Sequence, residues 1–208
     1  MIAVDVEATG LDADKASIVS IGAIDLDDPT NQFYEECRVW EGAHISEEAL
    51  AVTGFSREEI GAAAGEGMTK QTEGELVQNF IAWATDRPRS FTFVGQNPRF
   101  DCAFVEAACK RAAVEFPFPH RTIDTHSLCW LHMVKRGLVP PEKDKRSGIN
   151  LDYILEYAGV PPEPKPHNAL TGASCHAEVF SRIAYTKKLL PEFFSYDIPW
   201  ETEITSTK

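Results

Sequence analysis

The sequence is poor in positive charge. It has 20 lysine and arginine residues against 32 aspartate and glutamate residues, which gives a net charge of −12 over 208 residues. Because acidic proteins repel phosphate backbones at long range, this balance excludes a protein that binds duplex nucleic acid through its overall charge. A nucleic-acid substrate would need divalent cations at the site, or a local basic segment, to offset the repulsion.

Cysteine is scarce, and long apolar runs are absent. The five cysteines form no Cys-x-x-Cys pair, and their odd number and scattered spacing favour a reducing, cytoplasmic environment over a disulfide framework or a zinc site. No apolar stretch approaches the roughly 18–20 residues that cross a bilayer, and the first residues lack the features of a signal peptide. These absences predict a cytoplasmic protein without a membrane partner.

Internal repeats and low-complexity tracts are also absent. The composition, 43% hydrophobic and 25% charged, is that of a globular protein, and 208 residues suffice for one buried core. Strand-like segments come first, and strands alternate with helices afterwards. The order predicts one α/β domain on a mixed sheet over residues 1–194, followed by a loosely ordered tail over 195–208.

Hydrophobic periodicity and helix-capping residues locate the expected elements. The expected strands cover 2–6, 17–26, 32–40, 91–94 and 122–124, and the expected helices include 72–85, 125–134, 151–158, about 169–190 and one that opens near Pro98. Ser46 and Ser56 are suited to begin two short helices, because their hydroxyls can accept hydrogen bonds from a first helical turn. Residues 61–67 are expected to form a loop.

Asp5 and Glu7 stand in the first expected strand and carry the strongest signal. Residues two apart in a strand point to the same side, so both carboxylates share one face. Unpaired carboxylates cost free energy to bury, and their oxygens suit Mg²⁺ or Mn²⁺. The pair therefore indicates a cation site. An ordinary edge strand with exposed acids would give the same pattern. Other segments of the sequence are needed to distinguish a cation site from such a strand.

Two further segments carry candidate chemistry. A strand end, a Gly-Gln-Asn turn and a helix place Asp101 near the carboxyl end of a strand, where ligands collect in α/β proteins. His167 precedes the last long helix, and an imidazole beside a metal can take a proton from water. Each has an ordinary alternative, because acids favour helix starts and most lone histidines are surface residues or satisfied core residues.

Taken together, three segments resemble the motifs of the DEDDh-type 3′–5′ exonucleases, which are DnaQ-like and RNase T-like. They are D-x-E-x-T-G from Asp5, N-x-x-F-D ending at Asp101, and H-x-A from His167. The resemblance implies an RNase H-like α/β fold with a five-stranded mixed sheet flanked by helices. It also implies a hydrolase that cleaves phosphodiester bonds at the 3′ end of single-stranded DNA or RNA with two Mg²⁺ or Mn²⁺ ions.

The same resemblance implies a role for each matched residue. Asp5 would bridge the two metals, Glu7 and Asp101 would complete the acidic cluster, and His167 would be the general base for the attacking water. The substrate-binding residues would be Thr9, Gly10, Asn97 and Phe100. The implied partners are single-stranded 3′ ends or short oligonucleotides, and a homodimer is expected because many relatives are dimers.

Gly172 breaks the family pattern H-x-A-x-x-D, because it stands where the last metal-binding Asp belongs. Losing one carboxylate should weaken the metal site, so Gly172→Asp is expected to raise activity. His176, one helical turn later, is a candidate substitute ligand that would favour Mn²⁺, with simple packing as its alternative. Otherwise cleavage is slow with fewer ligands, or the chain is a degenerate module that binds nucleic acid or nucleotide without efficient cleavage.

A basic segment and a different substrate class complete the expectations. Lys135, Arg136, Lys143, Lys145 and Arg146 form the only dense positive stretch. This stretch is either a guide for a single strand or a solvated loop. The acids would also serve a small-molecule phosphohydrolase, which is a third interpretation beside the exonuclease and the binding module.

Overall fold

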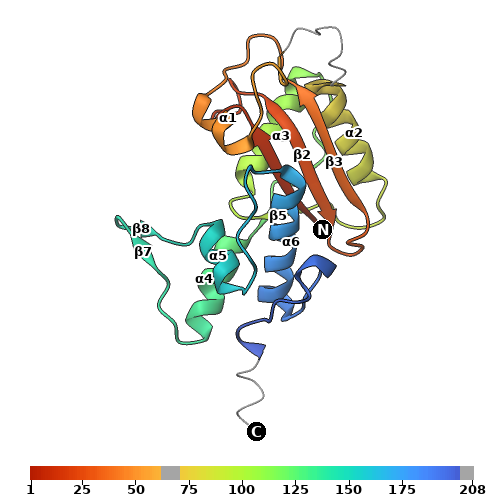
Figure 1. The fold of residues 1–208 in the computed structure, drawn as a ribbon. Helices are drawn as coiled ribbons and strands as arrows, with labels where there is room; N and C mark the ends of the chain where they lie inside the picture. The colour runs from red at the N-terminus through yellow and green to blue at the C-terminus, as the bar shows by residue number, and fades with distance from the viewer. Residues whose placement is uncertain (62–70, 202–208) are drawn as a thin grey trace.

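A mixed sheet organises the protein, with strands in the order β4-β3-β2-β1-β5-β6 (Figure 1). The computed structural model describes residues 1–61 and 71–201. The sheet strands are β1 (Ile2–Ala8), β2 (Ile18–Asp25), β3 (Gln32–Arg38), β4 (Gln71–Thr72), β5 (Phe93–Gly95) and β6 (Ile123–Asp124). β1, β2 and β3 are antiparallel neighbours, whereas β5 runs parallel to both β1 and β6.

The expected α/β, RNase H-like class is confirmed, but the sheet has six strands where five were expected. The additional strand, β4, consists of two residues that pair with the edge strand β3 immediately before a helix. Two residues are too few to show an alternating pattern, so nothing in the sequence marks this strand.

The helices are α1 (Glu47–Thr53), α2 (Glu73–Thr85), α3 (Arg99–Arg111), α4 (Thr125–Lys135), α5 (Leu151–Tyr157) and α6 (Ala169–Tyr185). α6 ends earlier than the expected residue 190, because Thr186 adopts a left-handed φ of 53°. The helix expected after Ser56 is a single turn, closed by the Ile60 N–H to the Ser56 carbonyl at 3.3 Å. Of the loop expected at 61–67, residues 62–67 lie outside the described part.

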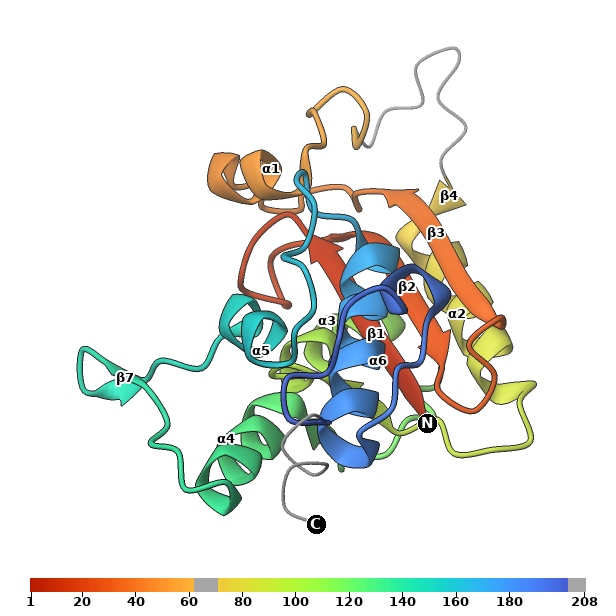
Figure 2. The ribbon, with the colours of Figure 1, turned by 60° about the horizontal axis from the view of Figure 1, so that its bottom comes forward.

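Helices cover both faces of the sheet: α2 and α3 pack on one face and α6 on the other (Figures 1 and 2). Along β1, Ile2, Val4 and Val6 belong to the core beneath α2 and α3, whereas Ala3 belongs to the core beneath α6. Because side chains alternate along a strand, Asp5 and Glu7 share the face of Ala3. The two acids therefore face α6.

The first turn of α6 lies directly against the sheet. Gly22 on β2 is the register partner of Asp5, and a Cβ on Gly22 would lie 2.1 Å from the backbone of Ala169. Only glycine permits this approach of two backbones. Gly22 thus brings the start of α6 close to the carboxylate of Asp5.

The C-terminal segment packs beside the far end of α6. Arg182 is fully buried, forms an ion pair with Glu178 at 2.6 Å and donates to several backbone carbonyls of this segment. Ile198 and Trp200 are only 2% and 4% exposed in the same core. Within the tail expected at 195–208, Ile198 and Trp200 therefore pack into this core while the residues around them are exposed, and 202–208 lie outside the described part. No helix among the described residues has both the length and the apolar character that crossing a bilayer requires.

Candidate metal and active site

Three of the expected acids meet at the carboxyl end of β1. Asp5 and Glu7 project from one face of β1, and Asp101 arrives from the first turn of α3. β5 pairs only with Ile2 and Ala3 of β1, which leaves the N–H of Val6 free to donate to Asp101 Oδ1 at 3.0 Å. This hydrogen bond holds Asp101 against the strand segment between the other two acids.

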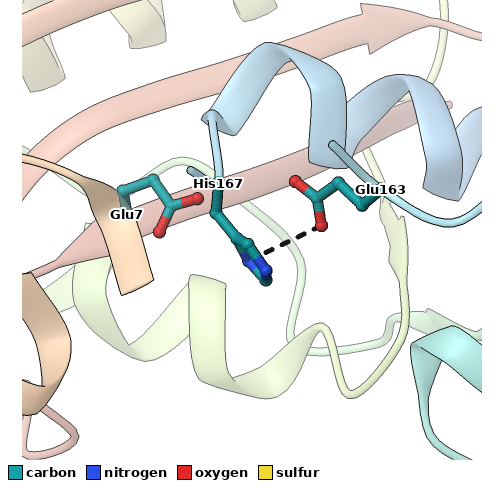
Figure 3. Close-up of side chains that lie close together, drawn as sticks. All are labelled: Glu7, Glu163 and His167. Carbon is teal, nitrogen blue, oxygen red and sulfur yellow. Dashed lines mark ion pairs between the residues drawn. The ribbon is translucent and has the colours of Figure 1, made fainter. Parts of the chain in front are cut away.

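His167 lies beside the same acids, in the loop before α6. Its backbone N–H donates to the carbonyl of Val52 at 3.0 Å, which ties the loop to α1. Ligand atoms of Glu7, Glu163 and His167 all lie within 4.8 Å of one another, and Figure 3 shows the three side chains gathered in one place. The structure therefore brings His167 to the acidic cluster, together with Glu163, which was not expected there.

Burial and mutual repulsion disfavour ionisation of these acids. Burial, followed by the charges of Asp5 and Glu163, raises the pKa of Glu7 to about 8. Burial and the charge of Asp5 likewise hold the pKa of Asp101 well above its usual range. The pKa of Glu163 is raised by burial and by Asp5, against a smaller lowering by His167 and His176.

Cationic side chains do not balance this cluster. Over residues 1–61 and 71–201, the only ion pairs of Asp5, Glu7, Asp101 and Glu163 are those with histidines, from His176 to Asp5 and from His167 to Glu163. Buried carboxylates without lysine or arginine are stabilised by divalent cations, which prefer oxygen ligands. The donor set therefore fits Mg²⁺ or Mn²⁺.

Gly172 faces Asp5 from the first turn of α6. A Cβ at this position would lie 2.4 Å from Asp5 Oδ2 and 2.6 Å from Asp5 Cγ, so the carboxyl group of Asp5 occupies the space of the missing side chain. His176 follows on the same helix face, only 3% exposed, with Nε2 3.3 Å from Asp5 Oδ1. Cys175 packs in the hydrophobic core, where burial raises the pKa of its thiol to about 12.

This geometry reverses the expectation for Gly172→Asp. We now expect both Gly172→Asp and Gly172→Ala to weaken Mn²⁺ binding about tenfold or more, because any Cβ at 172 must push the Asp5 carboxyl group out of its place. Calorimetric titration with Mn²⁺ measures the effect, and the alanine variant isolates the steric part. Tighter binding in the aspartate variant alone would show that Asp5 turns aside and that the cluster lacks a carboxylate.

A cleft of about 710 Å³ opens beside Glu7. The turn after β1, the segment around His44 and α1 form its walls, and Phe100 closes one side. Of the expected substrate-binding residues, Gly10 and Phe100 line this cleft. Asn97 does not line it: it is exposed in the turn before α3, where its N–H donates to Asp124 Oδ1 at 3.0 Å. The volume lies within the range of small-ligand sites.

Thr9, an expected substrate-binding residue, lies in the turn after β1 and is held there by hydrogen bonds. It is fully buried, its hydroxyl donates to the carbonyl of His44 at 2.6 Å, and the same oxygen accepts the N–H of Ser17 at 2.9 Å. Its backbone N–H donates to the carbonyl of Ser17, and its carbonyl accepts the N–H of Ser46. With these groups engaged, Thr9 holds together the turn that forms the cleft wall and does not reach into the cleft.

Glu163 lies beside Glu7 and His167, although no sequence motif marks it. It lies in the segment Pro161–Pro166, whose prolines are typical of a simple link between two helices. The available signal was its spacing, since an acid four residues before His167 belongs to the same short segment. The basic residues Lys143, Lys145 and Arg146 lie in the hairpin of β7 (Glu142–Lys143) and β8 (Arg146–Ser147), which projects from the body of the protein (Figure 1), whereas Lys135 and Arg136 lie at the end of α4.

Comparison with known proteins gives a family and a set of similar folds. Residues 2–180 match the RNase_T family, described as "Exonuclease", whereas no curated protein matches. The solved structure of cell-death related nuclease 4 (CRN-4) is similar with a TM-score of 0.67 and 18% identity, over 95% of this chain and 65% of that chain. The structure of E. coli exonuclease I in complex with an oligonucleotide is similar with a TM-score of 0.65 and 15% identity, over 93% of this chain and 42% of that chain.

A third structure, the nuclease domain of 3′hExo, a DEDDh family member bound to rAMP, gives a TM-score of 0.65 and 15% identity, over 91% of this chain and 93% of that domain. The present chain thus spans less than two thirds of CRN-4 and less than half of exonuclease I. At these identities the structures establish a shared fold, whereas the family pattern extends over most of the sequence. The chain belongs to the exonuclease family.

Proposed function

We propose that this protein is a metal-dependent 3′–5′ exonuclease that acts on single-stranded DNA or RNA. The observation that carries the proposal is the acidic cluster at the end of β1: Glu7 lies against His167, and Asp101 is held at Val6 between Asp5 and Glu7, beside an open cleft on a fold shared with nucleases. Two of the similar structures hold an oligonucleotide or a nucleotide, which supports nucleic acid as the substrate class.

The carboxylates of Asp5, Glu7 and Asp101 hold Mg²⁺ or Mn²⁺ in this proposal. When bound there, such ions would supply charge neutralisation at the scissile phosphate and a lower pKa for the attacking water. His167, whose side chain is 34% exposed beside Glu7, accepts the proton of that water as general base. Its partial exposure suits this role, since the imidazole must exchange protons with solvent.

The cleft beside Glu7 receives the terminal nucleotide. Leu11, Val52 and Phe100 offer apolar surface for the base, and Leu11 is 89% exposed at the rim. Gly10 lets the backbone approach the sugar and phosphate closely. Because the protein carries a net charge of −12, bound cations are needed before a phosphate can enter this acidic site.

The test uses a 5′-labelled single-stranded oligonucleotide, as DNA and as RNA, with Mg²⁺ or Mn²⁺. We expect a ladder of products shortened stepwise from the 3′ end, and no shortening in Asp5→Asn, which keeps the size of the side chain but loses its charge. Asp152→Asn, an exposed acid on α5, is the matched control and should cleave like the wild type. Binding without shortening in either metal would favour the degenerate binding module instead.

A further inference from the structure

Glu163 is the one acid of the cluster that the family pattern does not contain. We propose that Glu163 supplies the carboxylate ligand that Gly172 cannot provide, so that the loop before α6, and not α6 itself, completes the cation site. The inference rests on the proposed function, because it concerns the cations of that same site. It makes the site complete rather than weakened.

One oxygen of the Glu163 side chain is buried without a hydrogen-bond partner, although the carboxylate is paired with His167 and contacted by the backbone of Asn168. The side chain is only 6% exposed, and its Oε1 atom has no hydrogen-bond partner. Its Oε2 atom lies 3.6 Å from Nδ1 of His167, which is too long for a hydrogen bond. An unpartnered, buried carboxylate oxygen costs free energy, and a cation bound at that oxygen removes the cost.

The position of Glu163 suits a ligand that is shared with β1. One of its oxygens lies within 4.8 Å of ligand atoms of both Glu7 and His167 (Figure 3). Asp5 is also near enough to raise the pKa of Glu163. Glu163 therefore brings the number of carboxylates around the site back to four, with Asp5, Glu7 and Asp101, and ligand charge is what sets cation affinity.

The two other candidates for the missing ligand are placed less well. A side chain at position 172 would first have to displace the carboxyl group of Asp5, which fills the space in front of Gly172. The Nε2 atom of His176 lies 3.3 Å from Asp5 Oδ1, and the other side of its ring lies against Gly95, where a Cβ would come within 3.4 Å of it. His176 therefore positions Asp5 through its Nε2 atom, while Glu163 reaches the cluster directly.

Metal binding without nucleic acid tests the inference. Calorimetric titration with Mn²⁺ should show about tenfold or more weaker binding in Glu163→Gln, which keeps the shape but removes the charge. Glu163→Asp keeps the charge on a side chain shorter by one methylene. Its Mn²⁺ affinity should lie between those of the wild type and Glu163→Gln. Glu156→Gln, an exposed acid on α5, is the matched control and should bind like the wild type. Circular dichroism confirms the fold of each variant.

The outcomes separate this inference from the proposed function. If Glu163→Gln binds Mn²⁺ within about twofold of the wild type while Asp5→Asn loses binding, the ligand role of Glu163 is wrong and the exonuclease proposal stands. If Glu163→Gln changes only the pH profile of cleavage, Glu163 positions His167 and is not a ligand. If neither variant affects Mn²⁺ binding and the wild type shortens no oligonucleotide, both proposals fail together.

Discussion

Replacing Asp101 by asparagine should reduce cleavage about a thousandfold and at the same time make the metal-free protein more stable. Asp101 is 4% exposed, and burial and the charge of Asp5 hold its pKa well above the usual range. The introduced asparagine would still accept the Val6 N–H through its amide oxygen, so the local structure is kept while the costly charge is removed. Oligonucleotide cleavage and thermal unfolding in EDTA measure the two effects.

Two control variants isolate the cause. Asp101→Ala loses the hydrogen bond from Val6 as well as the charge, so its activity should be equally low but its stability should not rise. Glu115→Gln, at an exposed acid in the loop after α3, should change neither property. Near-normal cleavage by Asp101→Asn would remove Asp101 from the metal site and would leave the proposed mechanism without one of its ligands.

The metal-free protein should lose stability as the pH rises from about 4.5 to about 8, and Mg²⁺ should restore it. In the folded protein the pKa of Glu7 is raised to about 8 from an ordinary 4.5, so the folded state binds more protons than the unfolded state between these values. By linkage, the free energy of unfolding then falls with rising pH in this window and is unaffected below it. Since one pKa unit corresponds to about 1.4 kcal/mol, the loss amounts to a few kcal/mol.

Urea unfolding at pH 5 and at pH 8, with EDTA or with Mg²⁺, measures this effect. The stabilisation by Mg²⁺ should be larger at pH 8, because at pH 5 the ion must displace protons from the acids. Glu7→Gln should be more stable than the wild type at pH 8 in EDTA, with a flatter pH dependence and a weaker response to Mg²⁺. A wild-type stability that does not change with pH in EDTA would contradict the raised pKa of Glu7.

Both predictions follow from the same arrangement. The protein keeps several acids close together in a buried place, which costs stability without cations and creates affinity for them. Proteins often accept such costs where function requires them. Asp101→Asn is expected to lower activity and to raise stability, so it measures how much stability the protein gives up for its activity.

Much of the candidate site was predictable from local patterns. The alternation of side chains along 2–8 put Asp5 and Glu7 on one face, and the helical period put His176 on the face of Gly172. Asp101 was expected near the end of a strand, and it lies there. These relations depend only on the geometry of one strand or one helix, which a short stretch of sequence determines.

Other features depended on contacts between distant segments. Thr9 was expected to contact the nucleotide, but its hydroxyl is engaged by His44 and Ser17. The motif predicts a simple loss at Gly172, although Asp5, far away in the sequence, fills its space. Glu163 stands in a proline-rich link whose path over the site no periodicity describes. In each case a partner from another element decides the role.

The sequence by itself determined the fold class, the family and the residues that face α6, because periodicity and motif spacing are properties of short stretches of chain. Only the tertiary structure decided which acid completes the cluster, where Asp5 points and which residues line the cleft. The reason is physical. Those properties depend on how closely α6 and its preceding loop approach β1, and Gly22, on a third element, sets that distance.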